Sequence, residues 1–394
     1  MKEGWTYKKL GVIAKDMYRG SGITRDQITA SGFPCIRYGE IYTTYNIAFE
    51  NCVSHTVENN ISPRKYFEHG DLLFAITGES VEDIGKTIAY LGHDKCLLGG
   101  DIVCMKHNEN PKYLAYALSS REAIRQKGIG KTKLKVVHTN IPSLKEIIIP
   151  IPPLSEQQSI VDYLDSAFAK IDAMKANAEK ALNEAKALFQ ASLKELLEPK
   201  EGWEEKTLKE ISVIFGNYGL SVPSTDFNGV RYLRITDITE WGDLNDEKVS
   251  AKIDEGQEQE LLEDGDILFA RTGATVGKTL MYKNEFGDCL FAGYLIRYRL
   301  RKDIVNPKFM FYITHSNEYY KWILENQKAA AQPNISAKLY NGYKVSYPSI
   351  QEQQSIIETL DSLKSKVDRL QENFDKISQE CDALKQAILR KVFE

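Results

Sequence analysis

The chain has 394 residues, of which 42% are hydrophobic and 27% charged, and its net charge is −4 at pH 7. This composition is typical of a globular protein, and the length suffices for two or three domains with cores of their own. No run of about 18 apolar residues is present and the N-terminal MKEGWTYKKL lacks the apolar segment of a signal peptide, so we expect a cytoplasmic protein without a membrane span.

The sequence repeats itself along its whole length. GWTYKKL near the N-terminus returns as GWEEKTL from Gly202, IRYGEI from Ile36 returns as LRITDI from Leu233, and NPKYLAYALSS returns as NPKFMFYITHS from Asn306. PPLSEQQSIVDYLDS from Pro152 returns as PSIQEQQSIIETLDS. Two copies are too few for a solenoid, which needs about three repeats or more. We therefore expect an α+β molecule with two pseudo-repeated α/β domains, each followed by a long helix.

The first domain, residues 1–154, mixes strand-like segments, glycine turns and short helical pieces. Its segment GDLLFAITGESVEDIGKT ends like a nucleotide-binding loop, and GDILFARTGATVGKT in the second half ends in the same way. A phosphate-binding P-loop has four residues between its first glycine and the Gly-Lys pair, whereas the first copy has six and the second has three. We therefore interpret both turns as scaffold. Lys86 and Lys278, which follow the turns, are candidate contacts of a DNA phosphate, because glycine lets a backbone approach closely.

Four residues of the first domain have side chains that can bind zinc. His93, Cys96, Cys104 and His107 follow the spacing His-x2-Cys-x7-Cys-x2-His. This is not a usual zinc spacing, and the second half keeps only Cys289 near the equivalent place. Buried free cysteines in strands are the alternative interpretation. The six cysteines of the chain form no Cys-x-x-Cys pair, which indicates reduced thiols. We expect no metal and no cofactor.

A basic segment, RQKGIGKTKLK, spans residues 125–135 of the first domain. Residues 1–154 hold 20 Lys and Arg against 16 Asp and Glu, although the whole chain is acidic. Basic side chains on a glycine-containing loop are suited to phosphate contacts, and a solvated surface loop is the alternative. The candidate residues are Arg125, Lys127, Lys131, Lys133 and Lys135.

Residues 155–198 and 351–394 contain neither glycine nor proline and are rich in Ala, Leu, Glu, Lys and Gln. They predict two helices, each about 66 Å long at 1.5 Å per residue. Apolar residues of the second helix step by four and three over about four heptads, as in a coiled coil. The equivalent positions of the first helix are smaller, which favours packing of one helix on the other. We predict these interface residues: Ile160, Leu164, Ile171, Met174, Leu188, Leu360, Leu363, Val367, Leu370, Phe374, Ile377, Leu384 and Ile388.

The first helix carries a second apolar stripe, formed by Phe168, Leu182, Phe189, Leu193 and Leu196. A helix with two apolar faces is buried on two sides. Packing of this stripe on another partner and packing on the globular domains of the same chain both remain open.

The second domain, residues 199–350, offers further candidate DNA contacts. LIRYRLR alternates apolar and basic residues with the period of a strand, which places Arg297 and Arg299 on one face. QKAAAQPNIS replaces the basic loop, and the amides of Gln332 and Asn334 are suited to adenine edges. Arg271, directly after the strand GDILFA, completes the set. A solvated surface is again the alternative.

Several of these segments resemble the specificity subunits of type I restriction–modification enzymes over essentially the whole chain. They are PPLSEQQSIVDYLD with its echo, the paired GDxLFAxTG segments, and the QPNIS and HTNIPSL strings. Pro348-Ser349-Ile350 stands where the family has Pro-Pro-Leu. The resemblance implies two target-recognition domains that each read one half of a split, asymmetric site on double-stranded DNA.

The same resemblance also implies partners. In that family the two helices pack antiparallel, set the spacing between the half-sites and dock two adenine-N6 methyltransferase subunits. Restriction subunits join through the methyltransferase, and the sequence leaves open whether they are present here. The specificity subunit itself catalyses nothing.

Two other classes of protein remain as alternatives. NPKY and NPKF resemble the Asn-Pro-Pro-Tyr or -Phe motif of amino-methyltransferases, but Lys112 and Lys308 occupy its third place and no glycine-rich cofactor loop accompanies them. Binding of S-adenosylmethionine by the chain alone would identify a stand-alone DNA methyltransferase. A coiled-coil scaffold protein that binds no DNA is the other alternative, and a gel shift with random duplex would separate it.

Overall fold

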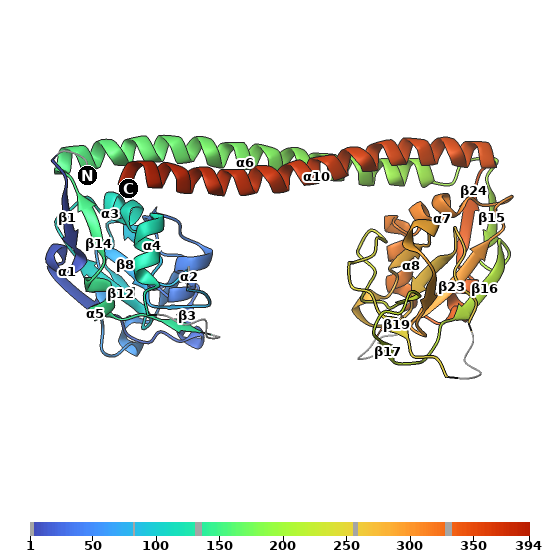
Figure 1. The fold of residues 1–394 in the computed structure, drawn as a ribbon, viewed down its shortest axis with the longest axis horizontal. Coiled ribbons are helices and arrows are strands. Elements are labelled where there is room, and N and C mark those ends of the chain that lie inside the picture. The colour runs from blue at the N-terminus through green and yellow to red at the C-terminus, as the bar shows by residue number, and fades with distance from the viewer. Residues whose placement is uncertain (1–3, 82, 131–135, 255–258, 328–332) are drawn as a thin grey trace. The chain divides into compact units, whose positions relative to one another are not determined.

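The computed structural model describes residues 4–81, 83–130, 136–254, 259–327 and 333–394. Contacts divide the chain into two compact units, the first formed by Met1–Ala178 with Phe374–Glu394 and the second by Glu179–Asn373. The chain passes between the units twice, both times within a long helix. Each unit contains sheets, short helices and a part of both long helices (Figure 1). The predicted α+β class with a repeated domain is confirmed.

The first unit contains two five-stranded sheets, β2-β12-β8-β10-β5 and β3-β6-β4-β11-β7, and the strand pairs β1-β14 and β9-β13. Every residue of the central strand β8 is buried, as expected for a sheet covered on both faces. The strands are β1 (Thr6–Lys9), β2 (Asp16–Arg19), β3 (Ile28–Thr29), β4 (Phe33–Ile36), β5 (Ala48–Phe49), β6 (Ser54–Thr56), β7 (Tyr66–Phe67), β8 (Leu72–Ala75), β9 (Thr77–Gly78), β10 (Thr87–Tyr90), β11 (Cys96–Leu98), β12 (Ile102–Lys106), β13 (Val137–His138) and β14 (Ile148–Ile151). The short helices are α1 (Leu10–Ile13), α2 (Tyr38–Thr43), α3 (Pro111–Ala117), α4 (Arg121–Lys127) and α5 (Ile141–Lys145).

The second unit contains a four-stranded sheet, β16-β23-β20-β21, and the pairs β15-β24, β17-β19 and β18-β22. Its strands are β15 (Glu204–Thr207), β16 (Ser212–Tyr218), β17 (Ser224–Thr225), β18 (Arg231–Leu233), β19 (Ser250–Ala251), β20 (Ile267–Ala270), β21 (Thr279–Met281), β22 (Cys289–Phe291), β23 (Leu295–Leu300) and β24 (Lys344–Tyr347). Its short helices are α7 (Pro307–Ile313), α8 (Asn317–Asn326) and α9 (Ala337–Asn341).

The sheet that contains β8 in the first unit and the four-stranded sheet of the second unit share one topology. The order β2-β12-β8-β10 of the first unit corresponds to β16-β23-β20-β21 of the second. The register agrees as well, because Ile102 faces Ala75 in the first sheet and Leu295 faces Ala270 in the second. The repeated Gly-Asp segments therefore form an inner strand in both sheets, β8 in the first and β20 in the second.

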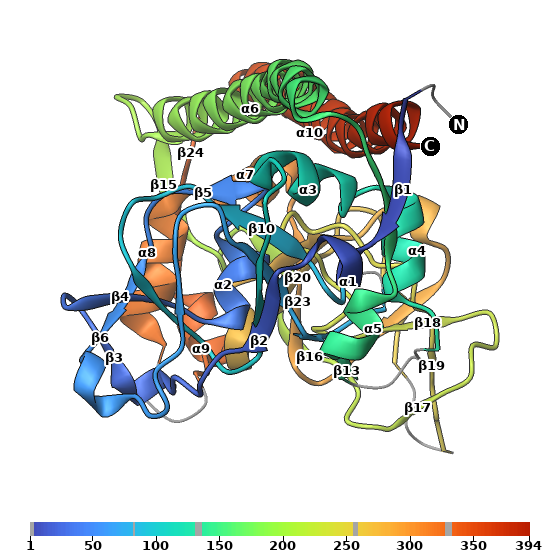
Figure 2. The ribbon, with the colours of Figure 1, turned by 90° about the vertical axis from the view of Figure 1, so that its left-hand side faces the viewer.

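The long helices α6 (Leu154–Leu197) and α10 (Ile350–Phe393) have 44 residues each. In the first unit they lie side by side in both views (Figures 1 and 2), and Lys385 of α10 is paired with Asp172 of α6. In the second unit Lys186 Nζ donates to Gln371 Oε1 over 2.8 Å. Higher numbers on one helix meet lower numbers on the other, so the predicted antiparallel packing is confirmed.

The predicted heptad positions describe most of this packing. Ten of the predicted interface residues are buried or half-buried, whereas Met174, Leu188 and Leu384 are 58%, 59% and 47% exposed, so for these three the prediction is wrong. The buried side chains of α6 come from both stripes: Leu164 and Ile171 belong to the predicted interface, and Leu182 and Phe189 belong to the second stripe. The covered positions of α6 step by three and four from Val161 through Leu164 and Phe168 to Leu196. The prediction had this spacing but chose the row that contains Met174 and Leu188 in place of the row that contains Phe168, Leu182 and Phe189, because apolar residues occupy both rows.

The second apolar stripe of α6 packs on the globular domains of the same chain. Phe168 belongs to the hydrophobic core of the first unit, and Phe189 and Leu193 belong to that of the second. The long helices therefore pack on the globular parts of their own chain as well as on each other.

One set of side chains ties the short helix α3 to α6, and an equivalent set ties α7 to α10. The amide of Gln157 accepts from Asn110 N over 2.9 Å, and Gln353 accepts from Asn306 N over 2.8 Å. Further along each helix, Asp165 binds Lys112 and Tyr116, and Asp361 binds Lys308 and Tyr312. The repeated NPK and EQQS segments thus carry one structural joint, used twice.

Candidate nucleic-acid interface

The two Gly-Lys-Thr turns connect β8 to β10 and β20 to β21. Gly85 and Gly277 have φ angles of 73° and 87°, in the left-handed region that favours glycine. A Cβ at Gly85 would lie 3.1 Å from the side chain of Lys127, and a Cβ at Gly277 would lie 3.0 Å from that of Ile323. Turn geometry and the close approach of α4 or α8 therefore explain these glycines, in agreement with their interpretation as scaffold.

Lys127 lies inside the first unit, with 5% of its surface exposed. Its ammonium donates to Leu118 O over 2.8 Å and to Thr87 Oγ1 over 3.1 Å, and burial lowers its pKa to about 7. The predicted phosphate contact of Lys127 is therefore wrong, because the ammonium does not reach the surface. Lys86 is half-buried and donates to Tyr45 O over 3.0 Å, and burial lowers its pKa as well.

Arg297 and Arg299 serve the sheet of the second unit. The Arg297 side chain is fully buried, and its Nε lies 3.0 Å from Asp266 Oδ2. Its predicted DNA contact is wrong, because the β23 face that carries it is covered by the fold. Arg299 is 19% exposed and binds Asp266 over 2.7 Å and Glu263 over 2.6 Å.

Four predicted contacts lie at or near the surface. Arg125 is exposed and pairs with Glu122 over 2.7 Å. Lys278 is half-buried and lines a cavity of about 500 Å³ in the second unit. Arg271 and Asn334 are half-buried too. The remaining predicted contacts, Lys131, Lys133, Lys135 and Gln332, lie outside the described residues.

Arg271 and Asn334 belong to a backbone arrangement that occurs in both units. Arg271 N donates to Tyr294 O over 3.0 Å, and Ile335 N donates to Arg271 O over 2.9 Å. In the first unit Ile76 N donates to Asp101 O over 3.0 Å, and Thr139 N donates to Ile76 O over 2.9 Å. A pair of facing residues follows in each unit, Thr272 with Asn334 and Thr77 with His138.

We call the side-chain positions on this shared backbone the rim. Each rim includes the last paired residue of the edge strand, Arg19 of β2 or Tyr218 of β16, which occupy equivalent places in the ladders with β12 and β23. The rim of the first unit is formed by Arg19, Ile76, Thr77, Asp101 and His138. The rim of the second unit is formed by Tyr218, Arg271, Thr272, Tyr294 and Asn334.

The second rim combines aromatic rings with unpaired polar groups. The guanidinium of Arg271 lies 4.9 Å from the ring centre of Tyr218, and Tyr294 is 59% exposed. Arg271 Nε and Asn334 Oδ1 are buried and have no hydrogen-bond partner among the described residues. Unpaired buried atoms, again among the described residues, also occur on Arg37, His107, Arg231 and Arg297. What distinguishes Arg271 and Asn334 is their place at the rim, where a ligand can pair with the two atoms.

The first rim is charged instead. Arg19 Nη2 lies 2.5 Å from Asp101 Oδ1, with 59% and 38% of the two side chains exposed. His138 is exposed, and its Nδ1 lies 3.1 Å from Thr77 Oγ1. The position of Arg271 is taken by Ile76, which is 6% exposed and carries no polar group.

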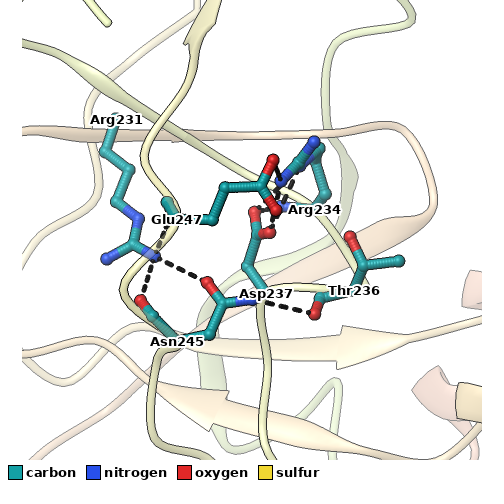
Figure 3. Close-up of polar contacts among 6 residues, drawn as sticks. All are labelled: Arg231, Arg234, Thr236, Asp237, Asn245 and Glu247. Atoms are coloured by element: carbon teal, nitrogen blue, oxygen red, sulfur yellow. Dashed lines mark hydrogen bonds and ion pairs between the residues drawn. The ribbon is translucent and has the colours of Figure 1, made fainter. Parts of the chain in front are cut away.

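A polar network fixes the loop that follows β18 (Figure 3). Arg231 Nη2 donates to the carbonyl oxygens of Asn245 and Glu247, both over 2.7 Å, and Arg234 binds Asp237 over 2.7 Å. The repeated segments IRYGEI and LRITDI form the same local contact. Arg234 N donates to Asp237 over 2.8 Å in the second unit, and Arg37 N donates to Glu40 over 3.2 Å in the first. These arginines already bind acids and carbonyls, so we do not count them among the DNA contacts.

The four possible zinc ligands do not form a metal site in the part of the chain that the structure describes. Cys96 and Cys104 are buried in strands β11 and β12, and the ring of His93 stacks on that of His69 at 5.5 Å. The described helices also include none that is long and apolar enough to cross a membrane.

Comparison with known proteins places these features in a family. Residues 2–184 and 200–379 match the family described as type I restriction modification DNA specificity domain, once in each half. The chain belongs to this family.

Several relatives are themselves specificity subunits. The chain is 24% identical to the type I restriction enzyme StySPI specificity subunit of Salmonella potsdam and to the EcoKI subunit of Escherichia coli strain K12, over 100% of this chain and 89% of each relative. It is 26% identical to the EcoBI subunit of Escherichia coli over 66% of this chain and 61% of that relative.

Solved structures agree in fold. A chain from a structural study of complex assembly and conformational transition in the type I R-M system superposes with a TM-score of 0.77 at 20% identity, covering 99% of this chain and 98% of that chain. The HsdS subunit from Thermoanaerobacter tengcongensis superposes with a TM-score of 0.57 at 20% identity, covering 100% and 97%. The fold is thus that of a type I specificity subunit.

Sequence reasoning found two of the ten rim residues of this specificity subunit, Arg271 and Asn334. The string HTNIPSL was singled out only through the family resemblance, although the residue offset between the long helices α6 and α10 also aligns its His138 with Asn334. Arg19, Asp101 and Tyr294 lie on other segments of the chain, and only the sheet brings them to the rim.

Proposed function

We propose that this specificity subunit recognises a split DNA sequence, with each unit reading one half, and that it has no catalytic activity of its own. The observation that carries the proposal is the shared backbone beneath the two rims, which presents different side chains in the two units. Two readers on one scaffold suit two unlike half-sites, because base contacts specify a sequence whereas phosphate contacts only position the protein.

The roles of individual residues follow from their chemistry. Arg271 and Asn334 are suited to base edges, since Arg pairs with guanine and Asn with adenine in the major groove. Lys278, Arg125 and the basic segment that contains Lys131, Lys133 and Lys135 are suited to phosphates. The phosphate contacts would give affinity that falls with salt, and the base contacts would give sequence preference.

Methyltransferase subunits are the partners that supply the chemistry in this proposal. Tyr163, Met174 and Leu384 of the first unit expose 52%, 58% and 47% of their surface on the long helices. Tyr163 and Met174 lie on α6 and Leu384 lies on α10, so we assign the docking surface to the exposed side of these two helices. Two subunits, one for each unit, fit the repetition of the chain, and the helices would set the distance between the half-sites.

An exchange of domains tests this function. Residues 202–347 would be replaced by the matching segment of a family member with another target, and the chain would be co-expressed with its methyltransferase subunit. We expect one half of the methylated sequence to change and the other half to stay, as read by methylation-sensitive sequencing of host DNA. A change in both halves, or methylation without sequence preference, would contradict independent reading.

The stand-alone methyltransferase is tested separately. Lys112 of the NPKY segment binds Asp165 of α6, so this segment joins a domain to its helix. We expect the purified chain alone to give no heat of binding with S-adenosylmethionine in calorimetry, and the complex with methyltransferase subunits to give a clear signal.

A further inference from the structure

A comparison of the two halves separates the side chains that join a domain to its helix from the side chains of the rim. The joining side chains are the same, as shown by the pairs Gln157 and Gln353 and Asp165 and Asp361. On the rim four of the five positions differ, and only the threonine is shared. The backbone beneath the rim is nevertheless bonded in the same way in both units.

Most of the differing rim positions are also accessible, and Ile76, at 6% exposed, is the buried exception. Arg19, His138, Tyr218 and Tyr294 are exposed, and Asn334 is half-buried. Their side chains are therefore free to differ without changing the core, while the common backbone holds them in equivalent places. A surface whose geometry is constant and whose chemistry varies is suited to reading different bases.

The residue that faces the shared threonine is His138 in the first rim and Asn334 in the second, and these two side chains offer different hydrogen-bonding groups. Asn334 offers an amide whose Oδ1 has no partner among the described residues. An adenine edge provides the N6–H donor that this oxygen lacks and an N7 acceptor for the amide NH₂. His138 offers a ring instead, and when Thr77 donates to its Nδ1 over 3.1 Å the proton resides on Nε2. An Nε2–H donor suits the O6 acceptor of guanine, at the place where adenine carries the N6–H donor instead, so contact with O6 separates the two purines.

We propose that His138 and Asn334 are equivalent specificity-determining residues, His138 selecting guanine in one half-site and Asn334 selecting adenine in the other. The remaining rim residues set the surroundings of each. Arg19 and Asp101 surround His138 with a charged pair, whereas Arg271, Tyr218 and Tyr294 surround Asn334 with a cation and two rings. This inference rests on the proposed function, namely that each unit reads one half of the DNA site.

The test exchanges the two residues in the full chain, purified with its methyltransferase subunits. Asn334→His and His138→Asn would be compared with wild type by selecting bound duplexes from a library randomised across both half-sites, and by measuring affinity at several salt concentrations. Asn317→His is the matched control, because Asn317 is an exposed residue of α8 in the same unit and is not part of the rim.

We expect Asn334→His to change the preferred base at one position of one half-site, with a loss of discrimination for the original base of about 5- to 150-fold, the range of a bidentate contact. His138→Asn should do the same in the other half-site. The control should keep the wild-type preference, and the salt dependence should stay the same in all three variants, because no phosphate contact is lost.

Other outcomes overturn the inference. If both exchanges leave every base preference unchanged, the two residues do not read bases. If they weaken binding to all duplexes alike and reduce the salt dependence, they contact phosphates. A wild-type complex that selects no sequence would instead refute the proposed function, so the two failures are distinguishable.

Discussion

Lys127 and Ile323 occupy the same place in their two units, each under the glycine of a Gly-Lys-Thr turn. Ile323 completes a hydrophobic core there. Lys127 brings an amine into the equivalent space, and no ion pair among the described residues includes it. Burial disfavours its charged form, which is why its pKa falls to about 7.

This depressed pKa predicts a pH dependence of stability. The unfolded chain binds the proton of Lys127 up to about pH 10.4, whereas the folded chain releases it near pH 7. Between these values the unfolded state holds more protons, so the free energy of unfolding of the first unit rises with pH. The contribution of Lys127 is complete above the unfolded pKa and is lost as the pH falls to the folded pKa.

The variant Lys127→Ile copies the second unit and removes this dependence. Relative to the variant, wild type should gain about 2 kcal/mol of stability between pH 7 and pH 9. Hydrogen exchange of β8 and β10 amides, compared between the two proteins at each pH, measures this gain, and the amides of β20 and β21 serve as an internal control. A difference that stays constant with pH would show that Lys127 has an ordinary pKa.

Residues of this kind limit what the sequence predicts about the site. Lys127 and Arg297 lie in basic segments that read as DNA-facing, yet one packs under a turn and the other binds Asp266 inside a sheet. Long basic side chains are buried only when tertiary partners receive them, and a local pattern does not contain those partners. Arg271 was chosen for its place directly after the strand GDILFA and Asn334 for its amide. Both reach the rim, and their contact with DNA stays a prediction.

The long helices were the most predictable elements, because 44 consecutive residues without glycine or proline, rich in strong helix formers, favour an uninterrupted helix. Their existence and their mutual packing are both confirmed. The contact face was less predictable, because α6 carries two neighbouring rows of apolar residues at heptad spacing and the sequence does not show which row is covered. Leu182 and Phe189 are buried on one face, whereas Leu188, assigned to the predicted interface, is 59% exposed.

Met174, Leu188 and Leu384, which were assigned to the helix interface, are instead exposed and can contact another protein. We expect Met174→Asp combined with Leu384→Asp to abolish co-purification of the methyltransferase subunit while the fold is kept. Both side chains are about half exposed, so a charge costs little in the free chain. In a complex it would be buried without a partner, which costs far more.

Val12→Asp is the matched control, because Val12 is 73% exposed and lies on α1 away from the long helices. Co-purification should persist in this variant, and both proteins should give the circular dichroism and melting temperature of wild type. Retention of the methyltransferase by the double variant would place its docking surface elsewhere.

At the scale of the whole molecule, only the two long helices carry the chain from one unit to the other. We therefore expect the helices to act as the ruler for the DNA gap. Seven residues inserted after Ala178 in α6 and after Asn373 in α10 add about 10 Å of helix at 1.5 Å per residue. Since DNA rises about 3.4 Å per base pair, the gap in the methylated sequence should lengthen by about three base pairs, with the same bases read on both sides.

An insertion of two residues at each point is the contrasting variant. It turns the distal part of each helix by about 200°, at 3.6 residues per turn, and should abolish methylation rather than shift the gap. A methylated sequence with an unchanged gap after the seven-residue insertion would contradict the helices as a ruler.

The rim has a consequence for how such a molecule changes over generations. Arg19, His138, Tyr218 and Tyr294 are exposed, and the backbone beneath them is held by hydrogen bonds that do not depend on the side chain. Most substitutions at these four positions should therefore alter stability by no more than about 0.5 kcal/mol. Natural proteins are only a little more stable than they need to be, so most substitutions in a buried site are lost because they unfold the protein. Substitutions at the exposed rim positions avoid this loss. Mutational drift can explore new target sequences in one half while the other half, and the fold, stay intact.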